Sequence, residues 1–217
     1  MKKGIKLIYV LLIVMTLLSL TNLLGLKADG ESVQLAGLTV IVGVVAFFAT
    51  RKSNDSKDEG LDLKTFPAKL KNKKVIILML TPIVIDVLTI ILENKFFPEV
   101  LDHIWGRADF IETSKIPLMI IELIVFALGE EIAIRAFYQK QTTKLIGFVP
   151  SLILTSAIFA LGHFTFDRPI IVVLDLLEVF VDSLFFGLVF KETDNAWCSW
   201  LSHFVGNVVA IFLMLYI

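Results

Sequence analysis

Long apolar segments alternate with polar stretches along the whole chain. Each apolar run is close to the roughly 20 residues that an α-helix needs to cross the hydrocarbon core of a bilayer. Strand-like alternation of apolar and polar positions is absent, and only helices or closed barrels satisfy their backbone polar groups in lipid. The pattern therefore predicts an all-α, multi-pass transmembrane helical bundle with about seven spans. The predicted spans are Leu7–Leu26, Val33–Thr50, Val75–Leu92, Ile116–Ile134, Phe148–His163, Pro169–Phe190 and Ala196–Ile217.

The polar stretches indicate how the chain crosses the membrane. Residues 51–74 contain eight Lys or Arg residues, and Lys2, Lys3 and Lys6 precede the first span. Because short cytoplasmic loops are enriched in Lys and Arg, this pattern predicts a cell-membrane protein with a cytoplasmic N-terminus. We divide the chain into residues 1–115, N-terminal helices with the basic loop 51–74, and residues 116–217, a C-terminal core within the same membrane domain.

The composition agrees with a membrane protein and limits the kinds of partner that are expected. The 217 residues are 57% hydrophobic and 19% charged, whereas charged residues make up about 25% of a soluble domain. A formal net charge of −1 gives no global field that would attract nucleic acid. The expected surroundings are membrane lipids, and no nucleic acid is expected as a partner.

The fourth predicted span carries three charged residues at its end, Glu130, Glu131 and Arg135. A charge near the centre of a membrane helix costs about 2.5–3.5 kcal/mol, so such groups are usually paired and face protein. Glu131 and Arg135 are four residues apart and share a helix face. Glu130 points about 100° away and has no partner on its own helix, so it could act as a general base that activates water. The alternative is that all three mark the headgroup layer.

Two later spans carry polar residues at the same four-residue step. Phe159 precedes His163, and His203 precedes Asn207. An imidazole can orient or share a proton with a carboxylate, and the donors of His203 and Asn207 could stabilise an oxyanion. Each pair taken alone could equally serve as hydrogen-bonded contacts between helices. Taken together with Glu130, they predict one hydrolytic site for an amide bond.

A metal-assisted version of this site stays open. Glu130, His163 and His203 form a ligand set that catalytic zinc uses. The chain has no His-Glu-x-x-His helix, so a cofactor-free site is the favoured prediction.

Several other polar residues fall inside or beside the spans. Asp175, Glu178 and Asp182 share one face of the sixth span, which implies either a wet or protein-lined side or a segment at the interface. Asp86 is expected to point inward and to make a structural hydrogen bond. His103 lies in the polar stretch before the fourth span and is given no role.

The depth of the site residues is not consistent in this scheme. Arg135, Lys140 and Lys144 are interpreted as a short basic inner connection. Counting from the basic loops places Glu130 and His203 toward the inner half, yet His163 falls nearer the outer end of its helix. Either the fifth helix is tilted and begins later, or the count is wrong by one crossing.

The three ordered motifs resemble those of a known family. Glu-Glu-x-x-x-Arg from Glu130, Phe-x-x-x-His from Phe159 and His-x-x-x-Asn from His203 resemble the CAAX protease and bacteriocin-processing (Abi) family of intramembrane endopeptidases, related to the type II CAAX prenyl endopeptidases. The resemblance covers about half of the chain. It implies that Glu130 and His163 activate water, that His203 and Asn207 form the oxyanion hole, and that Glu131, Arg135 and Phe159 support the site. Many members have glycine where this chain has Ala136.

The resemblance implies hydrolysis of a peptide bond in a membrane-associated protein or peptide precursor. The alternative is a bacteriocin self-immunity or regulatory membrane protein that uses the same fold without cleavage. The enzyme is favoured because every motif residue is present. A transporter would be expected to show inverted repeats, and the sequence shows none.

Overall fold

The computed structural model describes residues 2–28, 31–32, 37–53, 60–108, 111 and 113–217. Helices make up nearly all of this part of the chain, which confirms the predicted all-α membrane bundle. In chain order the elements are α1 (Lys2–Leu20), η1 (Thr21–Leu24), β1 (Lys27–Ala28), β2 (Glu31–Ser32), α2 (Gly37–Ser53), α3 (Phe66–Lys69), α4 (Lys73–Phe96), α5 (Pro98–Arg107), α6 (Ile116–Glu130), η2 (Glu131–Gln139), α7 (Lys140–Ile146), α8 (Phe148–Gly162), α9 (Pro169–Thr193) and α10 (Ala196–Tyr216). The strands β1 and β2 form one short antiparallel pair.

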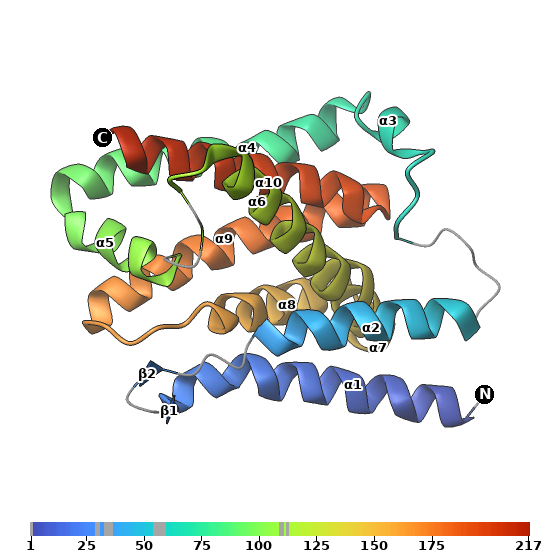
Figure 1. Ribbon diagram of the computed structural model, residues 1–217. Coiled ribbons are helices and arrows are strands. Elements are labelled where there is room, and N and C mark those ends of the chain that lie inside the picture. The colour runs from blue at the N-terminus through green and yellow to red at the C-terminus, as the bar shows by residue number, and fades with distance from the viewer. Residues whose placement is uncertain (1, 29–30, 33–36, 54–59, 109–110, 112) are drawn as a thin grey trace.

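The long helices are arranged around an oblique central segment. Figure 1 shows α1, α2, α8, α9, α10 and α4 running in roughly the same direction, while α6 and η2 cross them at an angle. Helix α1 packs against α2 and α8, and α2 packs against η2. On the other side, α10 packs against α4, α6 and α9. The segment from α6 through η2 therefore touches both halves of the bundle.

Local sequence signals define several helix ends. The side chains of Asn72 and Asn195 accept hydrogen bonds from the backbone N–H groups two residues later, at the starts of α4 and α10. Proline stands in the first turn of α3, α5, α6 and α9, where its missing N–H costs nothing. Gly147, with φ of 81°, allows the sharp turn from α7 into α8.

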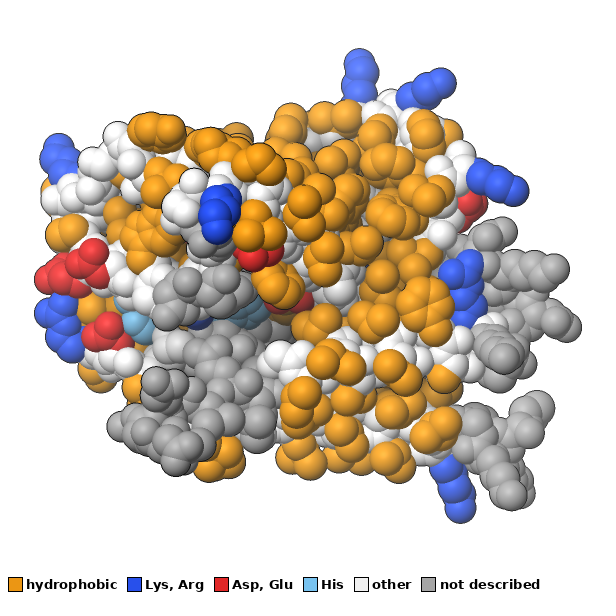
Figure 2. Space-filling view, viewed as in Figure 1, with side chains coloured by type: hydrophobic (Ala, Val, Ile, Leu, Met, Phe, Trp, Pro, Cys, Tyr) orange, Lys and Arg blue, Asp and Glu red, His pale blue; other side chains and the backbone are white. Residues whose placement is uncertain are grey.

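The surface and the helix lengths suit a bilayer. Within the described residues, three helical stretches are long and apolar enough to span one: Lys6–Leu24, Lys73–Phe96 and Ala196–Tyr216. Two shorter apolar helices accompany them, Gly37–Arg51 and Phe148–Gly162. Figure 2 shows hydrophobic side chains covering the middle of this face, with Lys and Arg side chains at its edges. The chain is a membrane protein.

The fourth predicted span is longer than the sequence indicates. Helices α6, η2 and α7 follow one another without a break, so the helical segment runs over residues 116–146. The helix does not end at Ile134, and residues 135–146, which were predicted as a short connection, are helical. The charges that suggested a connection have partners instead: Arg135 pairs with Glu131 one turn earlier, and Lys140 pairs with Asp194 just beyond the end of α9. Glu130 consequently lies in the middle of the segment, which removes the conflict in depth with His163.

The largest buried apolar cluster surrounds η2. Met15 and Phe47, from the first two helices, pack with Ala133 and Phe137 of η2. Gly43 of α2 lies so close that a Cβ atom there would be 2.5 Å from the Cβ of Ala133. In membranes, where helix association depends on close packing, small residues permit such an approach. The N-terminal helices thus fix the position of the segment that carries the charged motif.

Candidate active site

The charged motif lies where an α-helix changes to a π-helix. Helix α6 ends at Glu130, and the nine residues of η2, beginning with Glu131, are all buried. π-Helical turns are rare and occur often at functional sites. The change of winding begins at the boundary between the two glutamates, and their side chains enter different surroundings.

Glu131 and Arg135 form a fully buried ion pair. Oε2 of Glu131 lies 3.3 Å from Nε of Arg135, and both side chains have no exposed surface. The guanidinium also lies over the rings of Phe159 and Phe186, with its central carbon 5.1 Å and 5.8 Å from their centroids. Such contacts suit a desolvated guanidinium. The predicted pairing on one helix face is present in the structure.

Glu130 faces two imidazoles that come from other helices. Its Oε1 lies 3.9 Å from Nε2 of His163 on α8, and its Oε2 lies 3.6 Å from Nε2 of His203 on α10. The side chains of Glu130 and His163 are 23% and 24% exposed. The structure therefore brings together three of the predicted site residues, one from each motif.

A backbone hydrogen bond fixes the orientation of His163. The residue caps α8, and its Nδ1 lies 2.9 Å from the carbonyl oxygen of Phe159, one turn earlier. Because a carbonyl oxygen can only accept, Nδ1 carries the hydrogen. Nε2 is then the nitrogen turned toward Glu130. The ring of Phe159 also lies 4.6 Å from the imidazole, between centroids.

His203 connects the two glutamates. Its Nδ1 lies 3.2 Å from Oε1 of Glu131, while its Nε2 faces Glu130. The ring stacks on Phe186 at 4.6 Å between centroids. The two carboxylates, which sequence spacing directs to different points, thus approach opposite nitrogens of one imidazole.

Asn207 follows His203 by one turn of α10 and is partly buried. Its side chain makes no hydrogen bond to the described residues. The structure therefore leaves its amide available and does not join it to Glu130 or His163.

Two residues of α5 also belong to the surroundings of the site. Arg107 donates to Asp175 of α9 at 2.5 Å, and its charge acts on both Glu130 and His163. His103, which sequence reasoning left without a role, is buried and contacts Asp167 at 3.1 Å and Thr165 at 3.0 Å. In the sequence, the feature that could have assigned His103 and Arg107 a role is their spacing of four residues, which places them on one face of an amphipathic helix.

The acidic face of α9 is lined by protein. Asp182 faces Asp86 of α4, and Glu178 faces Glu93. Asp175 is buried against Arg107. These contacts agree with the protein-lined interpretation of the sixth span and with the prediction that Asp86 points inward.

The part of the chain that the structure describes contains no preformed set of metal ligands. No group of three or more His, Cys, Asp or Glu side chains there is arranged to hold a metal ion. The zinc alternative at Glu130, His163 and His203 thus gains no support from the donor geometry.

Comparison with known proteins gives one match. Residues 112–209 match the family model described as type II CAAX prenyl endopeptidase Rce1-like. No curated protein and no solved structure matches the chain. The matched segment includes all three motifs, from Glu130 to Asn207.

Proposed function

Because residues 112–209 belong to the Rce1-like family of type II CAAX prenyl endopeptidases, we propose that the chain is an intramembrane endopeptidase that cleaves a membrane-associated protein or peptide precursor. One observation supports this most strongly. A partly exposed carboxylate, Glu130, faces the Nε2 atoms of His163 and His203 at distances slightly beyond hydrogen-bond length. Gaps of this size suit a shared water molecule or substrate oxygen.

In the proposed first step, Glu130 acts as the general base. A water that hydrogen-bonds to Oε1 of Glu130 and Nε2 of His163 would be held by both groups. The water oxygen attacks the carbonyl carbon of the scissile peptide while its proton passes to Glu130. The hydrogen bond from Nδ1 of His163 to Phe159 keeps Nε2 directed at the water.

His203 and Asn207 are proposed to stabilise the tetrahedral intermediate. The contact between Nδ1 of His203 and Glu131 fixes the orientation of the ring, so that a hydrogen on Nε2 can be donated to the developing oxyanion. The amide of Asn207 supplies a second donor one helical turn away. Arg135 neutralises Glu131 from behind, so the pair supports the ring without reaching the substrate.

Collapse of the intermediate completes the reaction. The carbon–nitrogen bond breaks, and the proton held by Glu130 is transferred to the leaving amine, directly or through His163. The products are a new carboxylate and a new amine. The scheme uses no cofactor, and a bound zinc at the same three residues is the competing version.

The proposed orientation places the basic loop and the N-terminus in the cytoplasm of a cell-membrane protein. The loop contacts the turn between α9 and α10, where Lys74 pairs with Glu192 and Asn195 donates to the carbonyl of Asp62. The Lys-rich ends of α4 and α7 therefore share one end of the bundle with the loop. Concentration of cations on one side is typical of the cytoplasmic face.

The test is cleavage of a reporter peptide by the purified full chain in detergent. Glu130→Gln should abolish cleavage, because the amide cannot accept the proton of water. Glu122→Gln, which makes the same chemical change two turns earlier on α6, serves as the matched control and should cleave normally. Equal activity of the two variants would reject Glu130 as the base.

A chelator separates the two versions of the mechanism. Activity that survives a strong chelator would remove the zinc version. If the wild-type chain cleaves nothing while Glu130→Gln still protects cells against a bacteriocin, a non-catalytic immunity role would replace the enzyme.

A further inference from the structure

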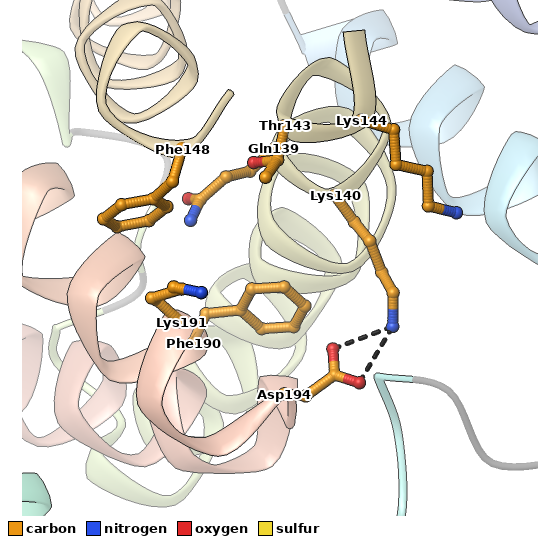
Figure 3. A pocket seen from close by; sticks show the side chains of 8 residues that line it. All are labelled: Gln139, Lys140, Thr143, Lys144, Phe148, Phe190, Lys191 and Asp194. Carbon is orange, nitrogen blue, oxygen red and sulfur yellow. Dashed lines mark hydrogen bonds and ion pairs between the residues drawn. The ribbon is translucent and has the colours of Figure 1, made fainter. Parts of the chain in front are cut away.

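A cavity lies away from the candidate active site, at the end of the bundle that carries the basic loop. Its volume is about 260 Å³, and it lies between the end of η2, α7, the start of α8 and the end of α9. Its lining residues are Gln139, Lys140, Thr143, Lys144, Phe148, Phe190, Lys191 and Asp194. Figure 3 shows Phe148, Gln139 and Lys191 around one space, with Lys140 turned toward Asp194.

The cavity carries an excess of positive charge. Three ammonium groups line it against one carboxylate. That carboxylate, Asp194, is already paired with Lys140 at 2.7 Å and 3.0 Å. Lys191 lies over the ring of Phe148, 5.3 Å from its centroid, and Lys144 is exposed on the other flank of α7. An anion that entered the cavity would meet Lys191 first.

The side-chain oxygen of Gln139, a buried hydrogen-bond acceptor, sets a second requirement for the ligand of the cavity. Gln139 is only 2% exposed, and its amide nitrogen donates to the carbonyl of Gly187 at 3.0 Å. Its Oε1 is buried and has no hydrogen-bond partner. Leaving such an atom unpaired costs about 1–3 kcal/mol. A ligand that brings a hydroxyl donor together with its negative charge would satisfy both the lysines and this oxygen.

The cavity opens next to an apolar surface. Val149 and Ile153 of α8 are 61% and 53% exposed and lie one turn apart, starting beside Phe148. Leu145 and Ile146, at the end of α7, are also exposed. A molecule seated at Lys191 could therefore extend hydrocarbon chains along this surface. A small soluble anion would make no use of it.

We propose that this cavity binds the headgroup of an anionic phospholipid of the cytoplasmic leaflet, with a hydroxyl-bearing headgroup such as glycerol as the best fit. The phosphate lies near Lys191, a headgroup hydroxyl donates to Oε1 of Gln139, and the acyl chains run along α8. Basic cavities between membrane helices on the cytoplasmic side commonly bind such lipids.

The test measures lipid binding to the purified full chain in a neutral detergent by native mass spectrometry. Phosphatidylglycerol is compared with phosphatidylcholine and with glycerol 3-phosphate. Lys191→Gln should weaken phosphatidylglycerol binding about fivefold, the effect of roughly one surface charge contact. Lys191→Arg should retain binding. Lys71→Gln, which removes an exposed lysine at the same end but outside the cavity, is the matched control.

The outcomes separate a specific site from general attraction. Equal losses of phosphatidylglycerol binding in Lys191→Gln and Lys71→Gln would overturn the proposal, because any basic surface would then be sufficient for binding. Equally tight binding of glycerol 3-phosphate would overturn the lipid assignment and leave a phosphate site. Equal binding of phosphatidylcholine would overturn the role of charge. Because the readout needs no cleavage, its result is independent of the proposed protease activity.

Discussion

Among the described residues, histidine meets carboxylate in two clusters, which differ in how completely their polar atoms are bonded. At His103, both ring nitrogens have close partners, at 3.1 Å and 3.0 Å, and the side chain is 4% exposed. At Glu130, the imidazoles lie 3.6 Å and 3.9 Å away, and the carboxylate is 23% exposed. A fully bonded cluster holds helices together. A cluster with longer gaps and an open side can exchange partners with water and substrate.

The largest expected effect tests this difference directly with two histidine variants. His163→Ala should lower cleavage by about 10²–10⁴-fold, the usual contribution of a positioned acid or base, while the free energy of unfolding in detergent changes little. His103→Ala should instead cost about 1–3 kcal/mol of stability, because it leaves its partners unbonded, and should retain much more activity. Cleavage and unfolding are measured on the same preparations. If His103→Ala abolished cleavage and His163→Ala lowered only the stability, the two histidines would have the opposite roles.

The next largest effect is expected at the buried ion pair of Glu131 and Arg135, which lies behind the site. Arg135→Met leaves the carboxylate of Glu131 without its cation and should destabilise the fold by about 3–5 kcal/mol. Combining it with Glu131→Gln removes the uncompensated charge, so the double variant should be more stable than Arg135→Met alone. Unfolding in detergent measures both. A single variant as stable as the wild type would show that the pair has no such role.

A smaller effect concerns the contact between the N-terminal helices and η2. Gly43→Ala places a methyl group against Ala133 and should cost about 1–3 kcal/mol of overpacking. Because Ala133 lies in the π-helix, cleavage should fall as well. Gly37→Ala, on the same helix with open space at its Cβ position, is the control and should leave both quantities unchanged. Similar results for the two variants would mean that α2 does not position η2.

The smallest effect is a pH dependence at the edge of the His103 cluster. The hydrogen bond from the backbone N–H of Arg168, followed by the one from His103, holds the pKa of Asp167 below its ordinary value of 3.8. Since the folded pKa lies below the unfolded one, the carboxylate stabilises the fold above pH 3.8, and this contribution disappears as the pH falls through the folded pKa. Asp167→Asn should flatten the stability curve in that acidic range. Identical curves would contradict the assignment.

Much of the fold could be predicted from the sequence because membrane helices carry a strong local signal. Each predicted apolar span contains a helix, and the motif spacing brings Glu131 to Arg135 and His163 to Phe159. These are contacts within one helix, which follow from a four-residue step. The convergence of Glu130, His163 and His203 was expected from the chemistry of the motifs rather than from any local pattern.

The failures share a physical cause in long-range pairing. Lys140 was interpreted as part of a connection because its partner, Asp194, lies 54 residues away in the sequence. The π-helical winding of η2 has no sequence signature that we could use. The sequence gives His103 no role because its partners, Thr165 and Asp167, come from a connection more than 60 residues away.

The central claim is that Glu130 activates water and does not itself attack the peptide. A single-turnover cleavage in ¹⁸O-labelled water, followed by mass spectrometry of the products, tests it most directly. The account predicts one ¹⁸O atom in the new carboxylate after the first turnover of the wild-type chain, and no product from Glu130→Gln. An unlabelled first product would mean that the oxygen came from a protein carboxylate, and cleavage by Glu130→Gln at the wild-type rate would remove Glu130 from the chemistry.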